Sequence, residues 1–490
     1  MDRQIKRLAL ALAVLFALLF AQLNWIQVFA ASRISNNPAN FRLIIEEYKV
    51  HRGEILGSDL QTVLARSVPT PGQQLKFLRR YPLGSLYGQI TGYYSLVYGR
   101  SGLEAAENDW LGAHASQLTF STLADEISNR PKQGASVVTT IDPHLQQVAS
   151  QAMNGRAGAI AALDPRTGAV LALVANPSYD PNPLSSHNPD EIKAAWKQLN
   201  ADPNKPLLSN ATDQIYPPGS TFKLIDTAAA LQNGYTPQSR LPNPQALKLP
   251  QTTHLFHNFA DSHCPGGSTI TLADALTVSC DVAFAALGLQ LGAETLQKQA
   301  EAFGFNSHIP FELRFSEGRF PPAEFFSDRL PLLAFSAIGQ ADVAANPLQM
   351  ALVGAAIANH GVEMQPQIVK EIRDPGGRVI ESMKPKVFSR PMPASVAATM
   401  TGMMVSVVQS GTGTPAQIPG VSVAAKTGTA ETPSGLPHVW FVAFAPADHP
   451  QIAVAVMLLN GGGAGPNATG GTVAGPVAKQ VIEAALGSHG

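Results

Sequence analysis

The N-terminal segment constrains this chain more than any other feature. Residues 8–32 carry no charged side chain, and a run of this length can cross a bilayer as a helix. Under the positive-inside rule, the basic residues before the run predict a cytoplasmic N-terminus: Arg3, Lys6 and Arg7. We therefore expect a cytoplasmic tail at 1–7, a single-pass membrane anchor at 8–31 and an extracytoplasmic remainder.

A cleaved signal peptide is the alternative to a retained anchor. Val28-Phe29-Ala30 fits a signal-peptide cleavage site. Because Leu23, Trp25 and Ile26 continue the apolar character toward the outer interface, we favour the anchor. The segment also carries polar residues that indicate a protein contact within the membrane or are simply tolerated near the interface: Gln22, Asn24 and Gln27.

Composition excludes several classes of function. The 490 residues include 34 Lys+Arg and 35 Asp+Glu, and the formal net charge of −1 predicts no nucleic-acid partner. Hydrophobic residues make up 45% of the chain and charged residues 14%, which is typical of a folded protein. Two cysteines are too few for a Cys-rich zinc site, and the 12 histidines show no metal-ligand spacing. We expect no metal and no cofactor.

The two cysteines, Cys264 and Cys280, lie in the part of the chain expected outside the cytoplasm. That compartment is oxidising, so a disulfide between them is favoured over two free thiols. The bridge would tie a loop to an apolar helical run.

Two regions follow the anchor. Residues 32–134 form a polar, Gly-dotted region that we interpret as a small separate domain. From residue 135 onward, β-like runs lie at both ends, with helical runs between them. The early runs form a hairpin, and the late runs form three strands: 157–163 with 169–175, then 421–430, 438–445 and 451–459. This order predicts one α/β domain at 135–490 whose sheet uses both chain ends.

The most informative motif is Ser220-Thr221-Phe222-Lys223, which opens an Ala-rich helix. Ser220 and Lys223 are three residues apart and therefore share a helical face. A serine hydroxyl needs an adjacent base to act as a nucleophile, and a lysine can serve if its pKa is lowered. Alone, the pattern more often means a capping serine followed by a surface lysine.

Two further motifs follow in order. Ser279-Cys280-Asp281 lies in a run, 276–289, that we expect to be one helix. Lys426-Thr427-Gly428-Thr429 ends a predicted strand. This ordered set is the signature of penicillin-binding proteins and serine β-lactamases, and the chain resembles that family.

The resemblance extends along nearly the whole chain. Residues 163–172, 336–340 and 347–351 look like further transpeptidase segments. Arg52-Gly53 and Gly102-Leu103-Glu104 look like the pedestal of class B penicillin-binding proteins, and the small size is most similar to actinobacterial members. The resemblance implies a mixed α/β fold with an antiparallel sheet between helices, plus the pedestal and one transmembrane helix.

The resemblance also implies roles for these residues. Ser220 would attack the penultimate D-Ala carbonyl of a peptidoglycan stem peptide, and Lys223 would take its proton. The backbone N–H groups of Ser220 and Thr429 would form the oxyanion hole. Ser279 would help to protonate the departing D-Ala. Lys426 would attract the donor's terminal carboxylate through its positive potential. The substrate-binding residues would be Thr427, Gly428 and Thr429. For Thr427, an inward-facing strand residue is the alternative.

Asp281 departs from the family pattern, which usually has Asn there. A carboxylate beside Lys223 would raise the pKa of that lysine and oppose its role as a base. Three interpretations follow: Asp281 is paired with Lys426 and leaves Lys223 neutral, or Asp281 is protonated, or turnover is slow and selective.

The predicted function is a monofunctional D,D-transpeptidase that β-lactams inhibit covalently. Such an enzyme would need a separate membrane-embedded glycan polymerase as its partner. The alternatives are a D,D-carboxypeptidase or β-lactamase, which pass the acyl group to water, and a catalytically blunted scaffold of the division machinery.

Overall fold

The computed structural model describes residues 2–25, 45–118, 131–253 and 255–487. Within these residues, one helix is long and apolar enough to cross a membrane, α1 (Asp2–Asn24). None of its side chains is buried by the rest of the described protein between Arg3 and Asn24. The helix begins before the basic residues, so the predicted tail and anchor are continuous. Gln27, the cleavage-site pattern at 28–30 and the end of the predicted anchor lie outside the described residues.

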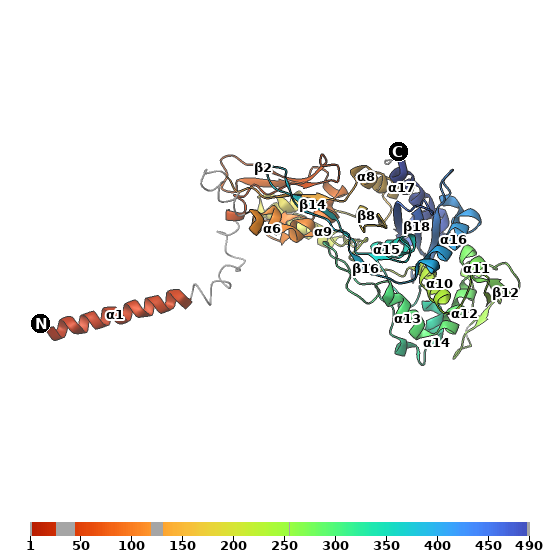
Figure 1. The fold of residues 1–490 in the computed structure, drawn as a ribbon. Helices are drawn as coiled ribbons and strands as arrows, with labels where there is room; N and C mark the ends of the chain where they lie inside the picture. Colours follow the sequence, from red (N-terminus) through yellow and green to blue (C-terminus); the bar gives the residue numbers. More distant parts are fainter. Residues whose placement is uncertain (1, 26–44, 119–130, 254, 488–490) are drawn as a thin grey trace.

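The centre of the molecule is a five-stranded antiparallel sheet built from both ends of the region after residue 135 (Figure 1). In sheet order its strands are β17 (Ala424–Ala430), β18 (His438–Ala445), β19 (Ile452–Leu458), β7 (Gly158–Leu163) and β8 (Val170–Asn176). All neighbouring pairs run antiparallel. The predicted hairpin, the three late strands and their union in one sheet are confirmed.

Helices cover both faces of this sheet, which explains why its central strands are continuous apolar runs. Every residue of β19 is buried. One face packs against α8 (Pro143–Met153) and α17 (Gly475–Gly487), and the other packs against α15 (Pro347–Ala358), which is buried along its whole length. Because β17 is an edge strand, one of its sides is left open for the nucleophile turn.

A helical lobe stands beside the β17 edge (Figure 1). It comprises α10 (Lys223–Gln232), α11 (Leu272–Val278), α12 (Asp281–Leu291), α13 (Ala293–Ala302) and α14 (Leu330–Ser336), with α16 (Ala394–Ser410) against β17. Short strands connect α10 to α11: β9 (Arg240–Pro242), β10 (Leu247–Lys248), β11 (Leu255–Phe256) and β12 (Thr269–Thr271). The expected single helix over 276–289 is wrong, because the chain ends α11 and starts α12 within that run.

The N-terminal region contributes to a second sheet of six strands, which crosses the predicted boundary at 134/135. Its order is β15 (Val379–Ser382), β14 (Val369–Arg373), β6 (Ser136–Thr139), β1 (Ile55–Leu56), β2 (Val63–Pro69) and β3 (Phe77–Arg80). Strands from late in the chain therefore join this region to the rest of the protein. The smaller helices of this region are α4 (Gly88–Thr91), α5 (Gly102–Ala106) and α6 (Asn108–Leu111).

A buried ion pair joins the two sequence patterns that resemble a pedestal, Arg52-Gly53 and Gly102-Leu103-Glu104. Glu104 is fully buried, and its two oxygens lie 2.6 Å from Arg52 Nε and 2.6 Å from Arg79 Nε. Burial alone would raise the pKa of Glu104, but the two guanidinium groups together hold it below its usual value. The carboxylate thus stays ionised and satisfies two arginines that are themselves buried.

Glu104→Gln should strongly destabilise this region, because it leaves two buried cations without a counter-charge. We expect the free energy of unfolding to fall by about 3–5 kcal/mol at pH 7. Because the folded pKa of Glu104 is depressed, its contribution is present above the unfolded pKa of about 4.3 and is lost as the pH falls through the folded value. Urea unfolding at pH 7 and pH 3.5 would measure both effects.

Glu46→Gln is the matched control, since Glu46 pairs with Lys49 on the exposed surface. This change should cost well under about 1 kcal/mol. Equal losses in the two variants would contradict a special role for Glu104.

Candidate active site

Ser220 lies in a tight turn, Gly219–Phe222, directly before α10. Gly219 has φ +54°, and a Cβ there would lie 2.7 Å from the carbonyl oxygen of Thr429 on β17. On the other side, a Cβ on Gly339 would lie 2.1 Å from the Gly219 carbonyl oxygen, and Gly339 accepts a hydrogen bond from Gly219 N–H at 3.0 Å. Glycine at both positions therefore lets the turn that carries Ser220 pack closely between β17 and the backbone of Gly339.

Ser279 lies between α11 and α12 in a left-handed backbone conformation with φ 61°. For a residue with a Cβ this conformation costs about 1–2 kcal/mol. It places the Ser279 hydroxyl 2.8 Å from Lys426 Nζ and 3.4 Å from Lys223 Nζ. The Ser279 carbonyl also accepts a hydrogen bond from Lys223 at 2.8 Å. The break in the predicted helix thus aims one hydroxyl at both lysines.

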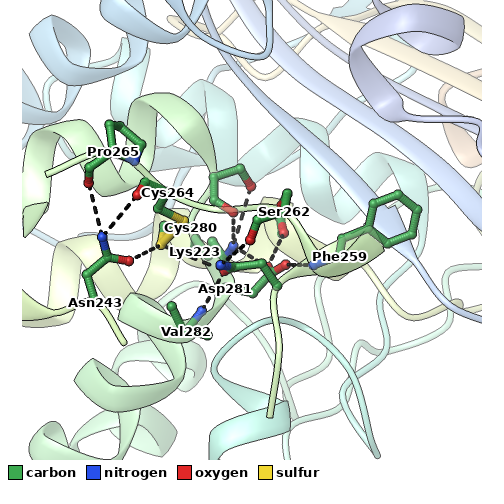
Figure 2. The surroundings of a disulfide bond; sticks show 12 residues. Lys223, Asn243, Phe259, Ser262, Cys264, Pro265, Cys280, Asp281 and Val282 are labelled. Atoms are coloured by element: carbon green, nitrogen blue, oxygen red, sulfur yellow. Dashed lines mark hydrogen bonds and ion pairs between the residues drawn. A yellow bond between two sulfur atoms is a disulfide. The ribbon is translucent and has the colours of Figure 1, made fainter. Parts of the chain in front are cut away.

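Asp281 is the first residue of α12, and both of its carboxylate oxygens have partners (Figure 2). Oδ1 lies 2.6 Å from Lys223 Nζ and accepts a hydrogen bond from Ser220 Oγ at 3.3 Å. Oδ2 accepts the backbone N–H of Phe259 at 3.0 Å. The Asp281 carboxylate therefore connects Ser220, Lys223 on α10 and the backbone of Phe259 in the segment before α11.

This geometry corrects one interpretation of Asp281. The sequence left open a pairing of Asp281 with Lys426, but the structure pairs Asp281 with Lys223. Lys426 Nζ instead donates to Ser279 Oγ and, at 3.0 Å, to the Thr427 carbonyl. The reason is positional: the start of α12 faces α10, whereas Lys426 approaches Ser279 from β17.

Burial controls the charge of both lysines, because neither side chain contacts solvent. Burial lowers the pKa of Lys223, and the adjacent Asp281 offsets only part of this effect. Burial also lowers the pKa of Lys426, well below its usual value, and the charge of Lys223 lowers it further. Lys223 has a carboxylate at 2.6 Å and Lys426 does not. Burial therefore favours the neutral amine at both lysines, and more strongly at Lys426.

A second carboxyl group lies one helical turn after Lys223. Asp226 is fully buried, and neither of its oxygens has a hydrogen-bond partner among the described residues. Burial raises the pKa of Asp226 well above its usual value, and the charge of Lys223 opposes this shift. Asp226 therefore favours its neutral form, which leaves Asp281 as the main counter-charge of Lys223.

A cleft of about 660 Å³ opens over these groups. Ser220, Asp281 and Thr429 line it, together with Glu431 and an apolar wall formed largely by Leu255, Phe256, Phe259, Leu332, Phe335 and Ile338. A larger cavity, of about 880 Å³, lies at the six-stranded sheet, and none of the predicted site residues line it.

Strand β17, which carries Lys426-Thr427-Gly428 (the K-T-G motif), forms the other side of the site. Thr427 is buried, and its hydroxyl lies 2.7 Å from that of Thr412. Gly428 packs on the nucleophile turn, since a Cβ there would lie 2.8 Å from the Pro218 carbonyl oxygen. Thr429 is half-buried and faces the cleft. The substrate-binding role predicted for these three residues stays a prediction.

The predicted disulfide between Cys264 and Cys280 is present. Figure 2 shows it between Asn243 and the Lys223–Asp281 pair. The Asn243 side-chain amide donates to the carbonyls of Cys264, Pro265 and Gly267, at 3.2, 3.0 and 3.0 Å. Because Cys280 directly precedes Asp281, the bridge ties the loop to the start of α12.

Comparison with known proteins now identifies the family. Residues 158–483 match the family described as the penicillin-binding protein transpeptidase domain, and residues 52–137 match the penicillin-binding protein A dimerisation domain. The chain belongs to the class B penicillin-binding proteins. It is 41% identical to the peptidoglycan D,D-transpeptidase PbpA of Mycolicibacterium smegmatis and 39% identical to PbpA of Mycobacterium tuberculosis, with 99% of each chain covered in both comparisons.

Solved structures agree with this assignment. Penicillin-binding protein A of M. tuberculosis, as its ceftriaxone acyl-enzyme complex, is 40% identical with a TM-score of 0.86, and the match covers 90% of this chain and 100% of that one. The penicillin G acyl-enzyme complex of the same protein is 41% identical with a TM-score of 0.83, covering 89% and 100%. The predicted penicillin-binding protein fold is confirmed.

Sequence reasoning found the groups that meet around Ser220 but missed three of their neighbours: Asp226, Phe259 and Thr412. Asp226 carried a usable signal, because an acidic residue in an Ala-rich apolar helix is exceptional. Phe259 acts through its backbone N–H, and Thr412 meets Thr427 only after folding. No sequence pattern reports either contact.

Asp281→Asn should shift the acid limb of acylation to lower pH. Asp281 raises the pKa of Lys223, and the lysine must be neutral to accept a proton, so removing the charge makes the base available at lower pH. We therefore expect the acid limb of Asp281→Asn to lie at lower pH than that of the wild type. The second-order rate of acylation by a penicillin between pH 5 and 9 measures it. Asp190→Asn, at an exposed position of another helix, is the control. An unchanged limb would show that Asp281 is not coupled to the base.

The disulfide should contribute to stability mainly by restricting the unfolded chain. Replacing both Cys264 and Cys280 with Ser should lower the free energy of unfolding by about 3 kcal/mol. Denaturation with and without a reductant tests this: the reductant should destabilise the wild type and leave the double variant unchanged. Equal stability of the two proteins without reductant would contradict the prediction.

Proposed function

We propose that this protein is a membrane-anchored peptidoglycan D,D-transpeptidase that works through a Ser220 acyl-enzyme. The observation that carries the proposal is the network at the base of the cleft, where Asp281 binds Ser220 and Lys223 on the same oxygen and Ser279 lies between the two lysines. The names of the relatives support the same reaction.

In the first half-reaction, Ser220 Oγ attacks the penultimate D-Ala carbonyl of a stem peptide. Lys223 in its neutral form takes the hydroxyl proton; burial favours that form, and Asp281 holds the two groups on one oxygen. Backbone N–H groups of Ser220 and Thr429 stabilise the oxyanion. The C–N bond to the terminal D-Ala then breaks, and the proton returns from Lys223 to the leaving amine through the Ser279 hydroxyl.

Substrate binding falls to the K-T-G strand. The hydroxyls of Thr427 and Thr429 bind the donor's terminal carboxylate, and Gly428 permits the close packing of the strand on the nucleophile turn. Burial lowers the pKa of Lys426 and so weakens the positive potential expected from that lysine. A bound carboxylate favours its protonation again.

β-Lactams enter the same first half-reaction. Opening of the lactam amide leaves the drug attached to Ser220 as an ester and blocks the second half-reaction. The acyl-enzyme structures of the M. tuberculosis relative support this proposal.

The second half-reaction separates the candidate functions. A transpeptidase passes the acyl group to an amine of a second stem peptide, whereas a D,D-carboxypeptidase passes it to water. The chain's match over 99% of relatives named transpeptidases favours the amine. A scaffold without turnover is the remaining alternative.

The topology and the partner belong to the same proposal. The basic residues at the start of α1 favour a cytoplasmic N-terminus and an extracytoplasmic site. The domains at 32–134 and 135–490 would then both lie outside the membrane. A membrane-embedded glycan polymerase would supply the strands to be cross-linked, and the polar residues Gln22 and Asn24 of α1 are a candidate contact.

Intact-protein mass spectrometry tests the nucleophile. Incubation with a penicillin should add the mass of one drug molecule to the wild type and nothing to Ser220→Ala, because only Ser220 forms the ester. Ser262→Ala, at an exposed serine near the site, should retain the adduct. A stable adduct on Ser220→Ala would overturn the assignment, and rapid loss of the drug by hydrolysis would indicate a β-lactamase.

A further inference from the structure

Glu431 is a feature of the cleft that the reaction described above does not use. Among the described residues, two carboxylates line the cleft, Asp281 and Glu431. Asp281 has partners on both oxygens, including Lys223 at 2.6 Å. Glu431 is exposed, and no described residue pairs with it. Within the described part of the chain, the cleft therefore offers one carboxylate that is free to bind a ligand.

The strand places Glu431 close to the reacting atoms. Glu431 directly follows the last residue of β17 and stands two residues after Thr429, and both residues line the cleft. Exposure increases from buried Thr427 through half-buried Thr429 to exposed Glu431. The residues run from the base of the site toward its mouth.

The turn after Glu431 is ordered. The Thr432 hydroxyl donates to the Leu436 carbonyl at 2.8 Å and lies 2.8 Å from the Ser434 hydroxyl. Glu431 thus directly precedes a hydrogen-bonded turn. The rest of the cleft wall is largely apolar, with Leu255, Phe259 and Phe335 among its residues. Among the described residues that line the cleft there is no Lys or Arg, and His257 is the one side chain that can carry a positive charge.

We propose that Glu431 binds the ammonium group of the acceptor stem peptide at the mouth of the cleft. This inference rests on the proposed function, and it adds the group that recognises the second substrate. A primary alkyl amine is a cation at neutral pH, and it must approach the Ser220 ester through this cleft. An unpaired carboxylate beside that path raises the local concentration of the cation.

The chemistry balances without a further reagent. The bound ammonium releases one proton to solvent and becomes a neutral amine. Its nitrogen attacks the acyl carbonyl, the C–O bond to Ser220 breaks, and the second proton of the amine passes to Ser220 Oγ. Glu431 binds and orients the acceptor, and the proton transfers belong to the groups around Ser279.

The test compares a cationic acceptor with a neutral one on the same acyl-enzyme. The full chain in detergent is given an N-acyl-D-alanyl thioester as donor, together with either an Nα-blocked lysine amide or hydroxylamine, which is largely uncharged at pH 7.5. The ratio of the two aminolysis rates is measured in the wild type, Glu431→Gln and Glu431→Asp. Glu294→Gln is the control, because Glu294 is an exposed carboxylate on α13.

We expect Glu431→Gln to lower the ratio of cationic to neutral aminolysis roughly three- to tenfold. Glu431→Asp should retain part of the ratio, and Glu294→Gln should retain all of it. Raising the salt concentration should bring the wild type toward the Gln variant, because salt screens exposed charges. An unchanged ratio in Glu431→Gln would overturn the inference while leaving the transpeptidase proposal intact. Failure of the wild type to form the acyl-enzyme would overturn the transpeptidase proposal itself.

Discussion

Two buried lysines share one small space with the carboxylate of Asp281, and the chemistry of this protein depends on that arrangement. In water both amines would be charged, and neither could accept a proton from Ser220. Burial makes a second positive charge costly, so the pKa of each lysine falls. The pKa of Lys426 falls most, since no carboxylate of the described residues forms an ion pair with it. The Asp281 carboxylate keeps Lys223 placed against Ser220 but also opposes its deprotonation.

The fold keeps these groups dry and close together. The edge strand β17 brings Lys426 to Ser279, and α12 brings Asp281 to Lys223 on α10. Glycines at the nucleophile turn remove the side chains that would hold these elements apart. The disulfide at Cys280 then anchors the loop whose Phe259 N–H satisfies the second oxygen of Asp281. The rigidity of the site comes from several elements that are distant in sequence.

Burial also acts on a titratable group in the N-terminal region, Glu104, but there the charged form is retained. Glu104 is as buried as Asp226, yet two arginines hold it ionised, whereas Asp226 has no hydrogen-bond partner among the described residues and favours its neutral form. A buried carboxyl group is therefore a structural ion or a neutral acid according to the cations within reach. Neighbours in three dimensions make that choice, and they are not readable from the residue type.

Much of the architecture followed from the sequence, because strand pairing and helix packing leave regular apolar patterns and because the motifs Ser220–Lys223, Ser279–Asp281 and Lys426–Thr429 occur in order. These patterns are local, and local patterns can be read along the chain. The partner of Asp281, the break between α11 and α12, the charge of each lysine and the position of Glu431 at the cleft mouth required the tertiary structure. Each depends on distances between segments far apart in sequence and on the exclusion of water between them, and only the folded chain defines those distances.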